Sequence, residues 1–137
     1  MDDKPLTQGI DHLGLTVRDL NVTRDFFMRC LGWTLVGERP DYPAAFISDG
    51  HTVLTLWQVT NPNKLIEFDR KTNIGLHHLA LRVRSEDALN EIFARAAGWP
   101  GVVVEFAPES LGKGPKRHAM LYEPGGIRVE FGFDPRK

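Results

Sequence analysis

The sequence has almost no cysteine, no excess of charge of either sign and no long apolar run. Cys30 is the only cysteine, so an intrachain disulfide and a zinc site built on several thiolates are excluded. Seventeen Lys and Arg against 18 Asp and Glu give a formal net charge of -1, which does not favour binding to nucleic acid or an anionic membrane. With no stretch long enough to span a bilayer, we expect a cytoplasmic protein whose partners are small molecules.

The remaining composition is typical of a globular domain. The chain has 137 residues, of which 42% are hydrophobic, and can bury a core of its own. Cys30 lies near the end of a predicted amphipathic helix. We therefore expect a buried structural thiol there rather than a nucleophile.

The chain matches itself at an offset of 66 residues. Positions 12–33 and 78–99 are identical at nine of 22 places, beginning with His12 and His78, whereas average composition predicts only about one or two matches. The sequence therefore contains an internal duplication.

Each copy opens with an alternating apolar pattern and continues with a helical one. Leu13, Leu15 and Val17 would line one face of a strand, and His12 would point to the other face. The helices are expected to begin at Asp19 or Asn21 and at Ser85, and to end at Gly32 and Gly98. Further strands are expected at 33–36, 44–47, 52–59, 102–106, 118–122 and 127–131. Both copies thus read βαβββ.

We interpret residues 1–137 as a single domain made of two such units, at about 8–60 and 74–133, joined by the polar stretch 61–73. Two βαβββ units, each opening on a His-Leu strand, resemble the vicinal oxygen chelate superfamily of glyoxalases, bleomycin-resistance proteins and extradiol dioxygenases. The resemblance covers nearly the whole chain. It implies an α+β fold in which tandem units form a curled mixed sheet, with a metal at the floor of a cup.

The same resemblance implies three metal ligands. His12 and His78 match the ligands in the first strand of each unit, and Glu130, after a proline-glycine turn, matches the ligand in the last strand. Alternation puts Glu130 across from Val129 and Phe131, which mark the core side. One divalent ion, Fe, Mn, Ni, Co or Zn, would keep open coordination places for a substrate.

Two further residues, His77 and Thr55, lie near these ligands in the sequence or in the fold but do not match a metal ligand of the family. His77, next to His78, would point to the opposite sheet face and be structural, because strand side chains alternate. Thr55 stands where glyoxalase I has a fourth, glutamate ligand. Whether Thr55, or Gln58 through a bulge, contributes to the site stays open.

Other residues are expected to surround the metal. His118 is the candidate general acid or base, because an imidazole near neutral pKa can move a proton beside a bound substrate; a histidine at the rim is the alternative. The basic segment 111–117 reads either as a lid that recognises an anion or as a solvated turn, and His51 reads as a turn residue. The candidate substrate-binding residues are Thr55, Trp57, Phe46, Arg82, Met120, Tyr122, Lys113 and Arg117.

Two functions from different classes fit these features. The first is a divalent-metal-dependent enzyme acting on a small oxygen-rich substrate, either a dioxygenase or a lyase or transferase; Thr55 disfavours glyoxalase I itself. The second is a non-catalytic protein of the bleomycin-resistance type that binds a drug or metabolite. A metal-stabilised interaction domain is a third reading. Family members commonly form dimers, so we expect a homodimer. The sequence leaves open whether the site is built within one chain or across two chains.

Overall fold

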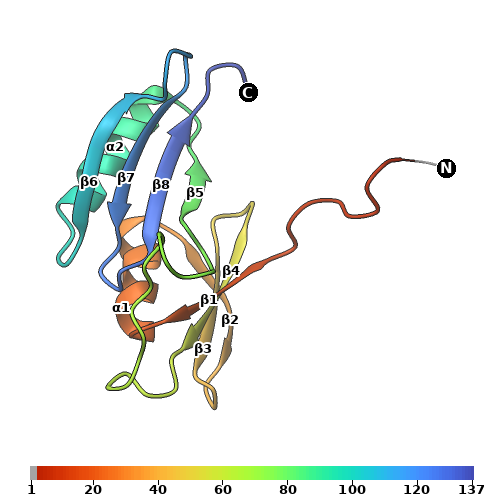
Figure 1. Cartoon of the computed structure of the whole chain (residues 1–137), viewed down its shortest axis with the longest axis vertical. Coiled ribbons are helices and arrows are strands. Elements are labelled where there is room, and N and C mark those ends of the chain that lie inside the picture. Colours follow the sequence, from red (N-terminus) through yellow and green to blue (C-terminus); the bar gives the residue numbers. More distant parts are fainter. Residues whose placement is uncertain (1–2) are drawn as a thin grey trace.

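Two four-stranded mixed sheets form the framework of the chain in the computed structural model, which describes residues 3–137. The first unit contains β1 Leu13–Val17, α1 Leu20–Asp25, β2 Thr34–Arg39, β3 Ala44–Ser48 and β4 Val53–Gln58. The second contains β5 Leu79–Arg82, α2 Glu86–Ala97, β6 Val103–Ser110, β7 Arg117–Tyr122 and β8 Arg128–Phe133. The predicted βαβββ order and the α+β class are confirmed. Figure 1 shows the two sheets at opposite ends of the long axis.

The two sheets have the same topology and the same register between the opening and last strands of each unit. Their strand orders are β1-β4-β3-β2 and β5-β8-β7-β6, with the opening strand of each unit parallel to its last strand. Gly14 pairs with Thr55 in the first sheet, and Ala80 pairs with Glu130 in the second. Since position 80 is 66 residues after position 14, Thr55 is the structural counterpart of Glu130.

The helices begin where the sequence predicts. The Asp19 carboxylate accepts hydrogen bonds from the backbone N–H groups of Asn21 and Val22, at 3.0 and 3.3 Å, so Asp19 is the N-cap of α1. The Ser85 hydroxyl accepts the N–H of Ala88 at 3.0 Å and caps α2. Both predicted caps are confirmed. Of the two candidates for the N-cap of α1, the structure has Asp19 and not Asn21.

The helix ends differ more from expectation. After Asp25 the first helix widens into a π-turn, η1 Phe26–Cys30, closed by the hydrogen bond from Leu31 N–H to Phe26 O at 3.1 Å. Gly32 follows with φ of 82°, the left-handed conformation expected of a helix-ending glycine. Gly98 was expected to do the same, but its φ is -86°, and the left-handed position belongs to Gly101 in the next turn.

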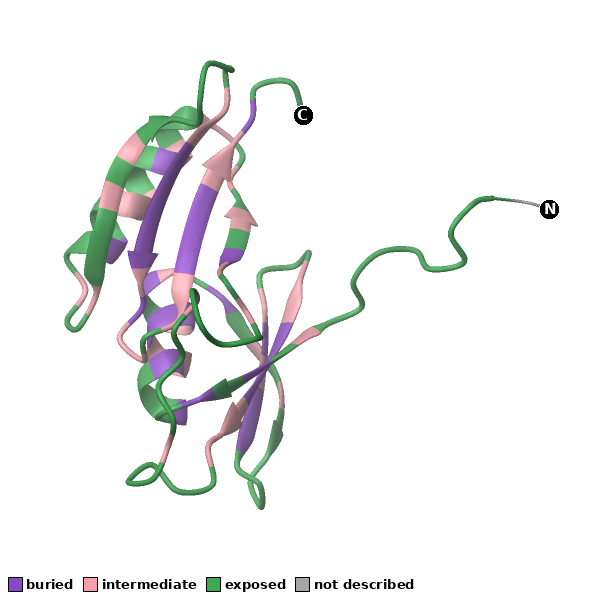
Figure 2. Ribbon diagram, in the orientation of Figure 1, coloured by how far each residue is buried: buried purple, intermediate pink, exposed green. Residues whose placement is uncertain are grey.

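The core runs through both units and is filled mainly from the helices and the central strands. Figure 2 shows buried residues along β7 and β8 and in α1, with the N-terminal segment exposed. Cys30 is fully buried, and this burial raises the pKa of its thiol, which confirms the structural reading. The large apolar residues that are exposed by 2% or less include Phe26, Phe27, Ile47, Leu54, Leu56, Leu89, Leu121, Val129 and Phe131.

A buried carboxylate joins the two units. Glu123, in the turn between β7 and β8, accepts the Thr23 hydroxyl of α1 at 3.0 Å and the N–H groups of Gly125 and Ile127 at 2.8 and 3.0 Å. Glu123 is 1% exposed, and its burial raises the pKa of the carboxyl although these donors act to lower it. The turn that leads into β8 is thereby attached to the first unit.

The second hairpin is tighter than the sequence indicates. Strand β6 continues to Ser110 with two register shifts, and the Leu111 N–H bonds the Lys116 carbonyl at 2.8 Å. The basic segment 111–117 is therefore a short turn followed by the first residue of β7.

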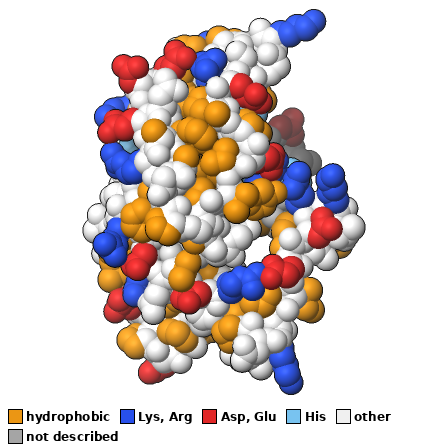
Figure 3. All heavy atoms as spheres, turned by 90° about the vertical axis from the view of Figure 1, so that its left-hand side faces the viewer, with side chains coloured by type: hydrophobic (Ala, Val, Ile, Leu, Met, Phe, Trp, Pro, Cys, Tyr) orange, Lys and Arg blue, Asp and Glu red, His pale blue; other side chains and the backbone are white. Residues whose placement is uncertain are grey.

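The surface in Figure 3 carries bands of hydrophobic side chains between charges of both signs and is hollowed near its centre. Among residues 3–137, no helix is both long and apolar enough to cross a bilayer.

Candidate functional site

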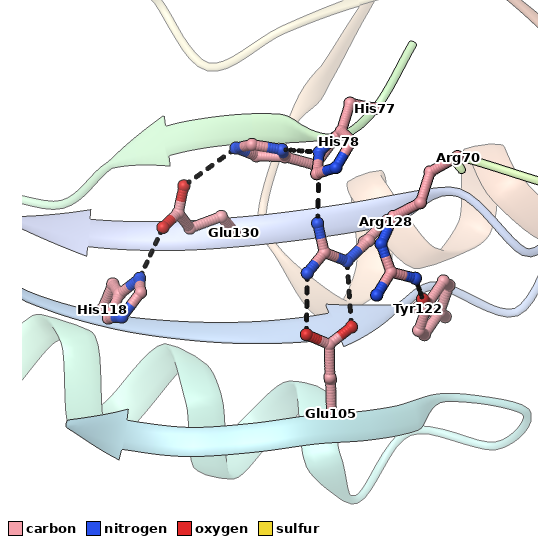
Figure 4. A network of polar contacts seen from close by, with 8 residues as sticks. All are labelled: Arg70, His77, His78, Glu105, His118, Tyr122, Arg128 and Glu130. Carbon is pink, nitrogen blue, oxygen red and sulfur yellow. Dashed lines mark hydrogen bonds and ion pairs between the residues drawn. The ribbon is translucent and has the colours of Figure 1, made fainter. Parts of the chain in front are cut away.

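Glu130 lies between two histidines on one face of the second sheet. Its Oε1 is 3.2 Å from His78 Nε2, and its Oε2 is 2.6 Å from His118 Nδ1 (Figure 4). The residues Glu130 and His118 are each only 9% exposed. Three side chains that sequence reasoning assigned to the site are thus in contact.

Strand register accounts for this grouping. Val129 and Phe131 are buried on the core side of β8, which turns Glu130 to the other face as expected. On that face Glu130 pairs across the sheet with Met120 of β7 and Ala80 of β5. His118 is two residues before Met120 and therefore shares its face.

His77 does not point away from His78, and the expectation that it would is wrong. Strand β5 begins at Leu79, so the two histidines precede the strand and the alternation rule does not apply to them. Their Nδ1 atoms are 2.7 Å apart, and His77 Nδ1 is also 3.3 Å from the Arg128 guanidinium. Partial desolvation, together with the neighbouring arginines Arg128 and Arg70, lowers the pKa of His77.

Sequence reasoning missed a group of charged residues next to these histidines. Arg128 donates two hydrogen bonds to Glu105 of β6, at 2.9 and 2.7 Å, and these bonds lower the pKa of Glu105. Arg70, from the segment between the units, donates to the Tyr122 hydroxyl at 2.7 Å. Arg128 could have been found, because it is two residues before Glu130 on the same strand. Arg70 lies in an irregular segment with no periodic signal.

His12 lies apart from the other expected ligands. Its Nδ1 is 2.7 Å from the neighbouring Asp11 carboxylate, and its side chain is 55% exposed. Among residues 3–137, no group of three or more His, Cys, Asp or Glu side chains is arranged to hold a metal ion. One copy of the chain therefore brings together His78 and Glu130 but not His12.

The corresponding face of the first sheet is aromatic. Trp57 Nε1 donates to the Thr55 hydroxyl at 2.9 Å, and the Trp57 ring packs against Phe46 and Tyr42 with centroids 5.6 and 4.7 Å apart. Thr55 and Trp57 share this face with Gly14, where an added Cβ would lie 3.2 Å from the Thr55 hydroxyl. The expected grouping of Thr55, Trp57 and Phe46 agrees with these contacts.

Gln58 is occupied away from this face. Its side-chain oxygen accepts the Leu20 N–H at 2.8 Å, and its amide nitrogen donates to the Arg18 carbonyl at 2.7 Å. Strand β4 has no bulge against its neighbours. The Gln58 side chain therefore supports the start of α1. The bulge that a ligand role would need is absent.

The remaining candidates divide between the two faces of the second sheet. Met120 is buried beside Glu130, Tyr122 contacts Arg70, and Arg82 is exposed at the end of β5. The expected place of Arg117 among the substrate-binding residues is corrected. Its guanidinium pairs with Glu86 of α2 at 2.8 Å, on the helix side of the sheet.

The hairpin turn carries two lysines in different surroundings. Lys113 is exposed in the turn, whereas Lys116 lies over Gly132, where an added Cβ would be 3.4 Å from the Lys116 Cε. Gly132 pairs with His118 across the sheet. His51 has the expected turn role, with its N–H bonded to Asp49 at 2.9 Å.

Comparison with known proteins places this duplicated architecture in a family. Residues 9–131 match the model of the glyoxalase/bleomycin resistance protein/dioxygenase superfamily. The chain belongs to this superfamily. Its members bind small-molecule substrates, often form dimers and generally use a divalent metal. No curated protein matches the sequence.

Several solved structures share the superfamily fold. A glyoxylase/bleomycin resistance protein/dioxygenase domain from Frankia sp. EAN1pec is 25% identical with a TM-score of 0.78, over 93% of this chain and 98% of that chain. The fosfomycin resistance protein FosX from Listeria monocytogenes is 19% identical with a TM-score of 0.72, over 94% and 95%. Lactoylglutathione lyase from Agrobacterium tumefaciens is 19% identical with a TM-score of 0.70, over 94% and 96%. The last two likenesses concern the fold alone.

The side chains around Glu130 fit the superfamily's use of a divalent metal. His78 Nε2 and Glu130 Oε1 face one another, while His77 holds the other nitrogen of His78 and His118 holds the other oxygen of Glu130. Supporting contacts of this kind fix the orientation of ligand side chains. Imidazole and carboxylate suit Fe, Mn, Co, Ni and Zn.

Proposed function

We propose that the chain is a divalent-metal-dependent enzyme of the glyoxalase/dioxygenase type, acting on a small oxygen-rich substrate at a site of two histidines and one glutamate. The proposed ligands are His12, His78 and Glu130. The observation that carries the proposal is the facing pair His78 Nε2 and Glu130 Oε1, each on a side chain whose second polar atom is held by another histidine.

The proposal assigns His12 to the site of a second copy of the chain. His12 is exposed, and the two sheets lie at opposite ends of the molecule (Figure 1). By register His12 is the counterpart of His78, since each precedes by two residues the position that pairs with Thr55 or Glu130. In a twofold dimer the first unit of one copy would meet the second unit of the other and complete two equivalent sites.

A divalent metal bound by these residues would polarise a carbonyl or phosphoryl oxygen of the substrate. His118 is the proposed general acid or base. Its Nδ1 contacts Glu130 at 2.6 Å, which leaves Nε2 to exchange a proton with the substrate and gives His118 a second role in orienting the carboxylate.

The first unit supports one group of reactions over another. Thr55, the counterpart of Glu130, offers a neutral hydroxyl that already accepts a hydrogen bond from Trp57. Such a group cannot serve as the carboxylate base of glyoxalase I chemistry. A dioxygenase, lyase or transferase reaction is therefore favoured within the proposal.

The aromatic face of Trp57, Phe46 and Tyr42 favours one alternative, a non-catalytic protein that holds a drug or metabolite. Such a protein would bind its ligand against this face equally well with and without metal. A binding measurement in the presence of a chelator separates the two functions.

The metal content of purified variants tests the proposal. After reconstitution with Mn, Fe, Co, Ni or Zn, wild type should hold about one ion per chain, and His12→Ala, His78→Ala and Glu130→Ala should each lose most of it. His51→Ala is the matched control, because it removes an exposed turn histidine. A wild type that takes up none of the five metals would contradict the proposal.

Mixing two inactive variants tests whether His12 comes from a second copy. His12→Ala and Glu130→Ala chains, unfolded together and refolded at equal amounts, would form mixed dimers with one intact site each. Random pairing should restore about one quarter of the wild-type metal content. A site completed within one chain would give no recovery.

A further inference from the structure

A cavity of about 580 Å³ lies where the segment between the units meets both of them. Its walls come from the end of β1, from the segment 59–77 and from the turn between β7 and β8. The candidate metal ligands do not line it, but His77, which touches His78, does. The cavity is thus a separate space beside the proposed metal site.

One corner of the cavity carries an excess of positive charge, because Arg70 and Arg128 both lie near a single carboxylate, that of Glu105. Arg70, His77, Tyr122 and Arg128 all line it, and Figure 4 shows the Arg70 and Arg128 guanidinium groups turned toward the same region. Glu105 neutralises Arg128 through two hydrogen bonds. Arg70 has the neutral Tyr122 hydroxyl as its partner and no ion pair among residues 3–137.

The other charges that line the cavity have partners of their own. Arg18 pairs with Glu67 on the opposite side. The carboxylate of Asp69 accepts the Lys71 N–H at 2.9 Å and so caps a turn instead of pairing with Arg70. Arg70 is therefore the cation to which an incoming anion has access.

The rest of the wall is apolar and open to water. Ile66 and Ile74 are exposed by 91% and 106%, and Phe68 by 47%, although all three line the cavity. Exposed apolar side chains around a concave space gain free energy when an apolar ligand covers them. The Phe68 ring also packs closely against Gly75, which keeps it at the rim.

We propose that this cavity binds an anionic small molecule with an apolar body, whose charged oxygens bond to the guanidinium of Arg70, which the Tyr122 hydroxyl holds in place. A carboxylate or a phosphonate meets the requirement, because a guanidinium can donate two parallel hydrogen bonds to either group. His77, at the same corner, offers a further ring nitrogen. The apolar body lies against Ile66, Phe68 and Ile74. This site does not depend on the proposed metal centre.

Calorimetric titration of the metal-free protein in a chelator tests the site. The probes are 4-phenylbutyrate, 3-phenylpropylphosphonate and the neutral 4-phenylbutanamide. We expect saturable binding of one or both anions and at least roughly 10-fold weaker binding of the amide, since a charge-assisted hydrogen bond is lost. The two anions also show which acid group is preferred.

Variants identify the cation. Arg70→Gln should weaken anion binding at least roughly 10-fold, Arg70→Lys should retain part of it, and Tyr122→Phe should give a smaller loss. Lys71→Gln is the matched control, because it removes the same charge one residue away and outside the cavity wall. Backbone amide shifts of the folded variants in NMR spectra verify that each remains native.

Three results would overturn the proposal. These are no saturable binding of either anion, equal binding of the amide, or an equal loss in Lys71→Gln and Arg70→Gln, which would indicate only general electrostatic attraction. Because the titrations use metal-free protein, their outcome is independent of the metal-content measurements. Failure of one proposal therefore leaves the other standing.

Discussion

The two units share one backbone plan but carry different side chains on matching faces. In the first unit that face presents Trp57, Phe46 and the hydroxyl of Thr55. In the second it presents Glu130 and His118, with their ionisable groups in contact. Equal register with unequal chemistry indicates that the framework sets where a side chain points, whereas single substitutions decide whether that place presents an ionisable or an apolar group.

The largest expected difference between the units concerns their turns. Glu123→Ala should lower the free energy of unfolding by about 3 kcal/mol, because the Thr23 hydroxyl and two N–H groups lose a buried acceptor. Asp49→Ala in the first unit should cost only about 0.5 kcal/mol, since water replaces the exposed carboxylate. Urea denaturation measures both values, and equal costs would contradict the asymmetry.

Placing the residue of one unit at the counterpart position of the other should change the metal affinity, downwards at position 130 and upwards at position 55. Glu130→Thr should weaken metal binding on the order of 100-fold, because a carboxylate ligand becomes a neutral hydroxyl. Thr55→Glu in the wild-type background should strengthen it roughly 10-fold by supplying a carboxylate at the equivalent place. Competition with a coloured chelator gives both affinities. Unchanged affinity in Thr55→Glu would mean that the first unit does not reach the metal.

The buried carboxylate also predicts a pH dependence that belongs to the second unit. Burial raises the pKa of Glu123 above its unfolded value of 4.5. Its contribution to stability is therefore fully present below about pH 4.5 and is lost as the pH rises through the folded-state pKa. Relative to Glu123→Gln, wild type should lose stability over that window with a slope of at most about 1.4 kcal/mol per pH unit. Parallel curves would show that Glu123 does not titrate there.

The smallest effect is expected on the helix side of the second sheet. Arg117→Ala removes a partly exposed ion pair with Glu86 and should lower the free energy of unfolding by about 0.5 kcal/mol. Metal and anion binding should stay unchanged, because the guanidinium points away from Glu130. A loss of either binding would restore the sequence-based assignment of Arg117 to the substrate.

The sequence predicts those parts of the molecule that follow from local periodicity. Alternation placed Glu130 opposite Val129 and Phe131, and the 66-residue repeat of positions 12–33 in 78–99 showed that each unit opens with a strand and a helix. These succeed because side-chain direction in a strand depends only on position. The cap at Asp19 was equally local, as its carboxylate needs only the next three residues.

The sequence could not predict features that depend on where a strand stops or on contacts between distant segments. The direction of His77 was wrong because β5 begins at Leu79, one residue later than expected, so that both His77 and His78 precede the strand. Arg70 reaches Tyr122 across 52 residues of sequence from a segment without regular structure. The π-turn after Asp25 likewise has no pattern of its own. Such contacts arise only when the chain is folded.

The hydrogen bond between Thr23 and Glu123 also bears on how the protein is made. Its partners are 100 residues apart, so the ribosome completes the first unit long before the acceptor for Thr23 has been synthesised. During that time a side chain that is fully buried in the native structure remains in water, along with the apolar surface around it. The core around Thr23 in the first unit can therefore be completed only after the second unit has been synthesised.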